Sequence, residues 1–177
     1  MLSTIVFCED KPARLPARDL AEVLARTLAS LVTAKVEGLL GDVRIAGPAR
    51  KGLGVVANHA GCALIEAESE ADWLGFALQA ARGPDVFLLR CGRAPEAGFI
   101  EEAGEFLAGN VKDKWRAARL RAAPESFIER ILPSAAPLAG LIAPRGLLLR
   151  APRGGFQKLA RCLGPAPAFQ TRARRIG

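Results

Sequence analysis

The sequence has no tyrosine, little lysine compared with arginine, and a single histidine, His59. Its four cysteines contain no Cys-x-x-Cys pair, and their wide spacing excludes the usual zinc-binding frameworks; they are Cys8, Cys62, Cys91 and Cys162. A catalytic dyad of His59 and Cys62 is disfavoured, because three residues across the end of a predicted helix give poor geometry. We therefore expect a structural role for His59.

Long hydrophobic runs are absent too. No window approaches the roughly 18 uninterrupted apolar residues that a transmembrane helix needs. The first residues, MLSTIVFCED, are apolar over too short a stretch for a signal peptide and lack a basic start. Since no cysteine motif points to secretion either, we expect a reduced, soluble, cytoplasmic protein.

The residues that are present fit a packed domain. A chain of 177 residues with 50% hydrophobic content predicts one domain over 1–177, ending in a mobile basic tail at 166–177. The net charge of +7 predicts attraction to anions. Because an arginine- and alanine-rich, tyrosine-poor composition is typical of GC-rich genomes, this charge argues little for a nucleic-acid partner. The best segments for one are 112–121, around Trp115, and the TRARR tail.

Strands and helices alternate through the first half. Apolar runs predict strands, and helical spacing of apolar residues predicts the helices between them. The expected strands are 2–8, 42–47, 61–67 and 86–89, and the expected helices are 18–31, 50–60, 70–82 and 95–107. This alternation predicts an α/β protein, a three-layer α/β/α sandwich with a mostly parallel central sheet.

The second half is less regular. Residues 114–122 fit either a strand or a basic helix, and five prolines interrupt the chain between residues 124 and 152. We expect one or two helical turns within 125–132, a strand at 146–151 and a short helix at 156–163.

The order of these elements and their local sequences resemble those of the family 2 glycosyltransferases, which act on nucleotide-sugars. The stretch LQAARGPDVFLLRCGRAPEAGFIEEA, 78–103, carries most of the resemblance. Supporting stretches are LARTLASL (24–31), GDVRIAG (41–47), HAGCALIEA (59–67) and PRGLLLRAPRGGF (144–156). The resemblance covers roughly residues 2–165 and implies a Rossmann-like GT-A fold, in a truncated form.

The family's acidic positions hold other residues here. Where the second strand normally ends in an aspartate, this chain continues from Ala46 to Gly52 without an acid. Where the fourth strand normally ends in two metal-binding aspartates, it reads Arg90-Cys91-Gly92-Arg93, and residues 139–142 lack the later acid as well. Thiols and guanidinium groups do not supply the hard oxygen ligands of Mg²⁺ or Mn²⁺. We therefore expect no divalent metal cofactor and assign no catalytic residue.

A phosphate-binding role is the functional interpretation of these substitutions. Arginine pairs with phosphate oxygens without a metal, and Arg50 and Lys51 would add positive charge at the neighbouring strand end. Glu9 and Asp10 would either contact a ligand or pair with Arg90 or Arg93, and strand adjacency would bring Cys8 near Cys91. The candidate ligand-binding residues are Cys8, Glu9, Asp10, Gly47, Arg50, Lys51, Arg90, Cys91, Gly92 and Arg93. The competing interpretation is that these arginines are solvated surface residues.

The residues support three functional hypotheses. The first is a glycosyltransferase-like domain that binds a nucleotide, a nucleotide-sugar, another phosphate-bearing anion or a protein partner without transferring sugar. The second is an active, metal-independent glycosyltransferase. The third is a charge-driven module for nucleic acid or protein, with nucleic acid the less favoured partner. A homo-oligomer is compatible with all three.

Overall fold

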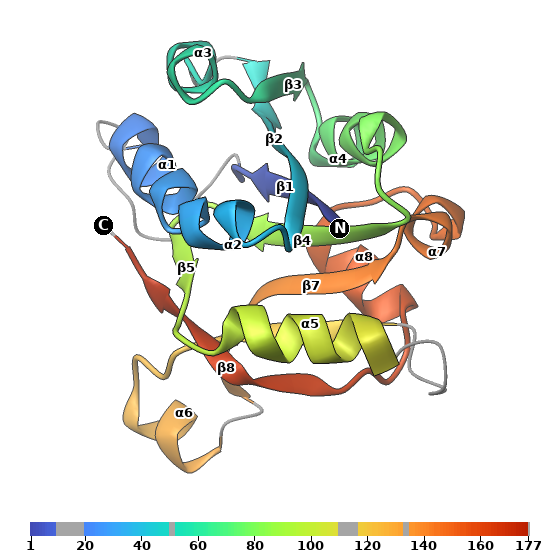
Figure 1. The fold of residues 1–177 in the computed structure, drawn as a ribbon. Coiled ribbons are helices and arrows are strands. Elements are labelled where there is room, and N and C mark those ends of the chain that lie inside the picture. Colours follow the sequence, from blue (N-terminus) through green and yellow to red (C-terminus); the bar gives the residue numbers. More distant parts are fainter. Residues whose placement is uncertain (10–19, 50–51, 110–116, 133–134, 177) are drawn as a thin grey trace.

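The computed structural model describes residues 1–9, 20–49, 52–109, 117–132 and 135–176 (Figure 1). The strands in these ranges are β1 (Leu2–Phe7), β2 (Leu40–Pro48), β3 (Ala63–Ala67), β4 (Asp85–Arg90), β5 (Arg93–Pro95), β6 (Ala118–Ala122), β7 (Leu138–Pro144) and β8 (Ala168–Arg175). The helices are α1 (Leu20–Ala29), α2 (Val32–Val36), α3 (Gly54–Ala60), α4 (Glu70–Ala80), α5 (Phe99–Gly109), α6 (Phe127–Ile131), α7 (Arg145–Arg150) and α8 (Phe156–Cys162).

The described strands form one mixed sheet in the order β3-β2-β1-β4-β7-β6-β8-β5. Strands β3, β2, β1 and β4 are parallel to their neighbours, as the alternation of strands and helices predicts. Beyond β4 the sheet departs from the mostly parallel arrangement that we expect from the sequence. Strand β7 runs antiparallel to both β4 and β6, because the connection from β6 to β7 returns the chain directly beside itself. Strand β8 is parallel to β6 and antiparallel to β5.

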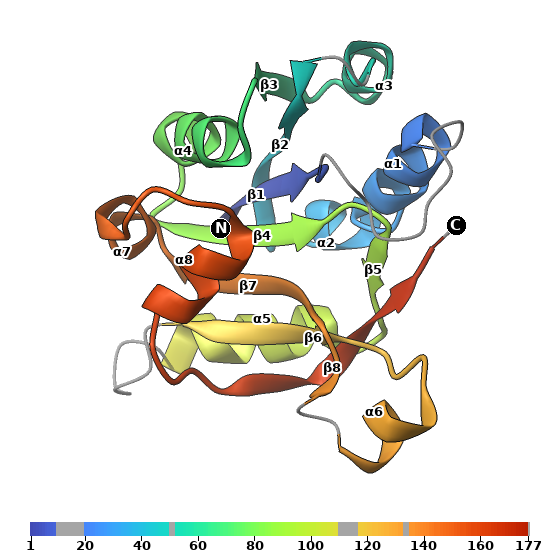
Figure 2. The ribbon, with the colours of Figure 1, turned by 180° about the vertical axis from the view of Figure 1, so that it is seen from behind.

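Helices cover both faces of this sheet, as a three-layer arrangement requires. One core contains apolar side chains of α1, α2, α3 and α5, and the other contains those of α4, α7 and α8. Figure 1 shows α1 and α5 in front of the strands, and Figure 2, from behind, shows α8 in front. Strand β1 is buried over its whole length, which explains its unbroken apolar sequence.

Local sequence accounts for the elements that lead to the carboxyl edge of the parallel strands. Helix α4 begins after Ser69, whose hydroxyl accepts a hydrogen bond from the Asp72 amide, 3.2 Å away. Helix α5 packs through Phe99, which lies between Phe87 of β4 and Phe169 of β8, with ring centroids 4.9 and 5.9 Å away. These contacts fix both the direction of β4 and the position of β8.

Several predictions for the second half are wrong. Residues 146–151 belong largely to helix α7 and not to a strand, and only Leu148 of that helix is buried. The strand lies just before it, at β7, where Gly140 and the flanking prolines weaken the strand pattern. The stretch predicted as a mobile tail contains β8, in which Phe169 and Ala173 are buried and anchor the strand. The short β5 precedes α5, which begins at Phe99, later than predicted.

Across the ranges that the structure describes, no helix combines the length and the apolar character required to span a membrane.

Candidate functional site

The candidate site lies where β1, β2 and β4 end side by side. In the register of β1 and β4, Phe7 pairs with Arg90. The amide of Cys91 then donates to the carbonyl of Phe7 at 2.9 Å, and the amide of Cys8 donates to the carbonyl of Ala46 at 2.8 Å. The three strand ends are therefore joined just beyond their last paired residues, at the edge where ligands bind in open α/β sheets.

Gly47 is required at this edge for packing. A Cβ atom built on Gly47 would lie 2.7 Å from the Cδ1 atom of Leu53 and 3.1 Å from the Cβ atom of Cys8. The absence of a side chain thus lets β2 approach the end of β1 closely. Gly47 itself is buried, so it contributes to the packing beneath the strand ends and does not present a group to solvent.

Cys8 and Cys91 are neighbours, as strand adjacency predicts, and both are free thiols. Their thiols share a hydrogen bond, which together with burial raises the pKa of Cys8 well above its ordinary value. The same bond lowers the pKa of Cys91, against the effect of burial and with support from Thr27. Thr27 also accepts a hydrogen bond from the Gly92 amide, at 3.0 Å, so α1 supports the turn after β4.

Glu9 and Arg90 form an ion pair at this edge. The Arg90 Nη2 atom lies 3.0 Å from the Glu9 Oε1 atom, and both side chains are only about one-fifth exposed, 21% and 22%. The Arg90 guanidinium also lies over the ring of Phe156, 5.7 Å from its centroid. Burial raises the pKa of Glu9, although the charge of Arg90 opposes this and that of Glu70 adds to it.

One atom of Arg90 has no partner among the residues that the structure describes. Its Nε atom is buried and makes no hydrogen bond with the residues that the structure describes. A buried donor without an acceptor costs free energy, so this position favours a ligand or water oxygen beside Arg90.

Arg93 does not join Arg90. Its Nη1 atom lies 2.6 Å from the Glu125 Oε1 atom, and Arg175 of β8 approaches the same carboxylate at 3.5 Å. Gly92, between the two arginines, has a φ of +84°, a left-handed turn that favours glycine. This turn directs the chain into β5, so the two arginines are held by different carboxylates.

Sequence reasoning missed Glu70 and Phe156 as parts of this edge. The Glu70 Oε1 atom accepts a hydrogen bond from the Phe156 amide at 2.8 Å, and a Cβ atom on Gly155 would lie 2.6 Å from the Glu70 carboxyl carbon. The segment PRGLLLRAPRGGF contains Gly155 and Phe156, so its resemblance to the family could have indicated that these two residues lie at this edge.

Asp10, Arg50 and Lys51 lie outside the described residues, and so does Trp115 with the first part of its basic stretch. Two described arginines of that stretch point into the protein. Arg119 donates to the carbonyls of Ala160 and Gly164, at 3.2 and 2.8 Å, and Arg121 donates to the carbonyl of Ala136, at 3.0 Å. These contacts occupy N–H donors of both guanidinium groups that could otherwise bind the phosphates of a nucleic acid.

The fold is similar to that of solved nucleotide-sugar enzymes. Mannosyl-3-phosphoglycerate synthase from Rubrobacter xylanophilus matches with a TM-score of 0.54 at 13% identity, over 83% of this chain and 55% of that chain. Glucosyl-3-phosphoglycerate synthase from Mycobacterium tuberculosis, in complex with Mn²⁺ and uridine diphosphate, matches with a TM-score of 0.60 at 12% identity, over 99% and 72%. The 4-diphosphocytidyl-2C-methyl-D-erythritol synthase from Anaerococcus prevotii matches with a TM-score of 0.62 at 7% identity, over 99% and 90%.

No family model matches the chain, and no curated protein matches its sequence. The chain spans 55% of the mannosyl-3-phosphoglycerate synthase and 65% and 49% of two further similar structures. At these identities the likeness concerns the fold.

The expectation that no divalent metal takes part is wrong for this group of structures. Three similar structures of the glucosyl-3-phosphoglycerate synthase contain Mn²⁺ with uridine diphosphate or its glucose conjugate. The described residues of the present edge supply two thiols and two carboxylates, Glu9, which is paired with Arg90, and Glu70, which accepts a hydrogen bond from the Phe156 amide. Among them, no group of three or more His, Cys, Asp or Glu side chains could hold a metal. We derive no step through a metal at this edge.

The strand order, the helices on both faces and the similar solved structures lead to one conclusion. The chain has a nucleotide-diphospho-sugar transferase-like fold, of the GT-A type that its sequence resembles.

Proposed function

We propose that this chain binds a nucleotide, a nucleotide-sugar or another phosphate-bearing anion at the carboxyl edge of β1, β2 and β4, without transferring sugar. The observation that carries this proposal is the buried Nε atom of Arg90, which lacks a partner among the described residues. A phosphate oxygen is a suitable acceptor for it, because guanidinium groups bind phosphate through two parallel N–H donors.

The surroundings of Arg90 hold its guanidinium in a fixed position. Phe156 lies against the guanidinium, and its ring in turn packs on Phe7, with centroids 4.5 Å apart. Arg90 is therefore held in place by an aromatic contact as well as by Glu9. An incoming phosphate would compete with the Glu9 carboxylate for the same guanidinium.

The lack of sugar transfer is inferred from the carboxylates. Transfer requires a base close to the acceptor hydroxyl. At this edge the described carboxylates are already engaged, Glu9 by Arg90 and Glu70 by the amide of Phe156. Glu9 would have to leave Arg90 before it took that proton, and the amide of Phe156 already occupies one oxygen of Glu70.

Calorimetric titration with uridine diphosphate, with and without Mn²⁺, tests the proposal. We expect saturable binding that Arg90→Ala weakens about tenfold or more, as expected for loss of a charge-assisted hydrogen bond. Arg153→Ala, an exposed arginine on the loop before α8, is the control and should bind normally. Absence of binding under both conditions, or equal binding by the Arg90→Ala protein, would refute it.

Sugar transfer at the same edge is the second candidate, and the raised pKa of Glu9 favours it, because such a carboxylate is a better proton acceptor once released from Arg90. The two candidates differ in one measurement. Release of uridine diphosphate from a uridine-diphosphate sugar in the presence of acceptor, lost in Glu9→Gln, would establish the second candidate and refute the first.

A further inference from the structure

A cavity of about 730 Å³ lies on the face of the sheet that carries α1, α2 and α3. It borders β2 at Gly41–Arg44, near the amino end of that strand, whereas the candidate nucleotide edge lies beyond the opposite end. Its size is in the range of small-molecule sites, about 300–1,000 Å³. The two sites are therefore separate, and a ligand in the cavity does not depend on the proposed function.

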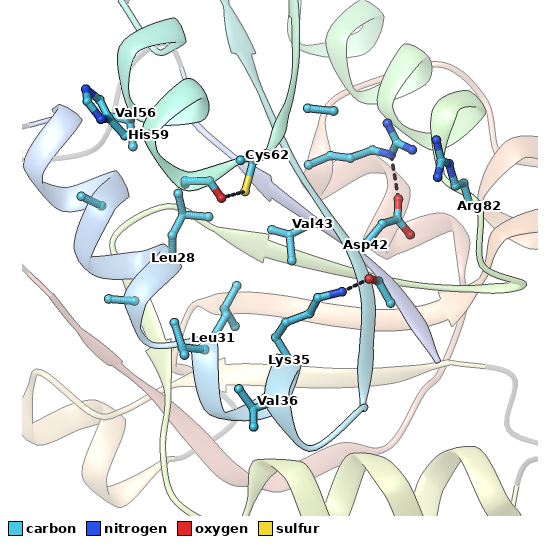
Figure 3. Close-up of a pocket in the computed structure, with 18 residues that line it drawn as sticks. Leu28, Leu31, Lys35, Val36, Asp42, Val43, Val56, His59, Cys62 and Arg82 are labelled. Carbon is cyan, nitrogen blue, oxygen red and sulfur yellow. Dashed lines mark hydrogen bonds and ion pairs between the residues drawn. The ribbon is translucent and has the colours of Figure 1, made fainter.

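The cavity has an apolar side formed by helices. Leu28 of α1, Leu31 after it, and Val56 of α3 line this side, with Val43 of β2 between them (Figure 3). Val32 and Val36 of α2 also line the cavity and are 57% and 79% exposed. Apolar side chains left in water at a hollow surface favour a ligand with an apolar body.

The other side of the cavity is charged. Its charged lining residues are Lys35, Arg44, Arg82 and Asp42, three cations against one carboxylate. Arg44 pairs with Asp42 at 2.9 Å, and Lys35 donates to the carbonyl of Gly41. The Asp42 carboxylate thus offsets one cation, and the field that remains in the cavity is positive. Figure 3 shows Lys35 and Arg82 on the side of Asp42, across from Leu28 and Val56.

We propose that this cavity binds a small amphipathic anion, an aliphatic carboxylate whose chain packs between α1 and α3 and whose head group lies between Lys35 and Arg82. The apolar wall holds the chain by the hydrophobic effect, at about 25 cal/mol per Å² of apolar surface removed from water. The positively charged side of the cavity favours a negatively charged head group, so a neutral molecule with the same chain binds less well.

The test compares dodecanoate with dodecanol, which has the same chain and no charge. Both are titrated as competitors of 1-anilinonaphthalene-8-sulfonate, a fluorescent apolar anion, at concentrations below micelle formation. We expect dodecanoate to displace the probe at least about tenfold more effectively than dodecanol, a difference that the variant carrying Lys35→Ala and Arg82→Ala abolishes. Equal displacement by both compounds, or no displacement by either, overturns the proposal.

A pair of adjacent valines supplies the matched control. Val56 lines the cavity, whereas Val55 does not and is 66% exposed on the same helix. Val56→Trp fills the cavity and should weaken dodecanoate binding about tenfold or more, while Val55→Trp should leave it unchanged. Dodecanoate binding that survives Val56→Trp in a protein with a normal circular dichroism spectrum overturns the assignment. The comparison of the two competitors on the unmodified protein decides the case if that variant fails to fold.

A third measurement separates this site from the nucleotide edge. Saturating uridine diphosphate should not displace dodecanoate, since the two ligands occupy opposite ends of β2. Direct competition between them would place both at one site and overturn the proposal for the cavity.

Discussion

Cys8 and Cys91 lie side by side at the ends of β1 and β4, and their thiols share a hydrogen bond. The hydrogen bond makes the two thiols chemically unequal, because it raises the pKa of Cys8 and lowers that of Cys91.

The first prediction concerns thiol reactivity. With iodoacetamide at pH 8, Cys162, which is exposed, should react first, Cys91 next, and Cys8 at least about tenfold more slowly than Cys91. The physical reason is that the thiolate is the nucleophile, and both burial and the hydrogen bond keep Cys8 protonated. Mass spectrometry of the alkylated peptides over time measures the three rates. Equal rates for Cys8 and Cys91 would contradict the pKa difference.

The second prediction separates the two arginines that flank Cys91-Gly92. Arg90→Ala leaves the Glu9 carboxylate half-buried without its cation, and we expect a loss of about 1–3 kcal/mol in the free energy of unfolding. It should also weaken uridine diphosphate binding, because the guanidinium is the proposed phosphate ligand. Arg93→Ala should leave that binding unchanged, because Arg93 pairs with Glu125, away from Glu9. Urea unfolding and calorimetry check the two effects, and equal loss of binding in both variants would contradict this distinction.

The third prediction concerns pH. Burial raises the pKa of Glu9, so the folded protein retains this proton to a higher pH than the unfolded chain. The folded state is therefore favoured below the ordinary pKa of the group, and this contribution is lost as the pH rises through the raised pKa. Relative to Glu9→Gln, the unmodified protein should lose stability from about pH 4.5 upward and then reach a plateau. Urea midpoints at several pH values measure the difference, and the opposite slope would contradict it.

The fourth prediction compares two glycines, one in a crowded position and one with free space around it. A Cβ atom on Gly140 of β7 would lie 2.6 Å from the backbone carbonyl oxygen of Leu88, so Gly140→Ala must displace β4 or β7. We expect it to cost about 1–3 kcal/mol, as overpacking does. Gly104 lies in helix α5 with nothing within 4 Å, so Gly104→Ala should instead stabilise the protein by about 0.5–1 kcal/mol. Thermal unfolding of the two variants should therefore shift in opposite directions.

The fifth prediction concerns the link between α5 and β8. Burial opposes ionisation of Glu102, but hydrogen bonds from Thr171 and from the amide of Gln170 outweigh it and lower the pKa. For a carboxyl with a lowered pKa, the stabilisation is present above the ordinary pKa and is lost as the pH falls through the lowered value. Glu102→Gln should thus unfold at lower urea concentration than the unmodified protein at pH 7, with a difference that shrinks in acid. A difference that does not depend on pH would contradict it.

The parallel half of the sheet was predictable because β1 and β4 are nearly continuous apolar runs and helical segments alternate with the strands. That pattern predicts β1 and β4, whereas their adjacency was implied by the resemblance to the GT-A fold. This adjacency predicts the neighbouring cysteines and, as one of the alternatives, the pairing of Glu9 with Arg90. The pairing of Arg93 with Glu125 was not predictable, because it depends on β5 and on the loop before α6, which carry no local pattern.

The second half resisted prediction for a different physical reason. The run Leu147-Leu148-Leu149 is apolar enough for a strand, yet it forms α7 and leaves Leu149 43% exposed. Strand β7 has a weaker local strand pattern than this leucine run. It forms a strand because it lies between β4 and β6 and pairs with both. Strand β8 has five exposed or half-buried polar positions and is held by packing of Phe169 and by the backbone of β6. Tertiary contacts override local preference in all three segments.

Strand β8 has a consequence for how the molecule assembles. It joins β5, from the middle of the sequence, with β6. Its pairing with β5 brings together residues as far apart in the chain as Arg93 and Arg175, whereas β2 and β3 pair over a much shorter separation, Arg44 with Ala63. Closing such distant segments is slow compared with forming local βαβ units. We therefore expect β1, β2 and β3 to form early in refolding and the attachment of Arg93–Pro95 to Ala173–Arg175 to come late, which a kinetic hydrogen-exchange experiment would detect as late protection of Ala173.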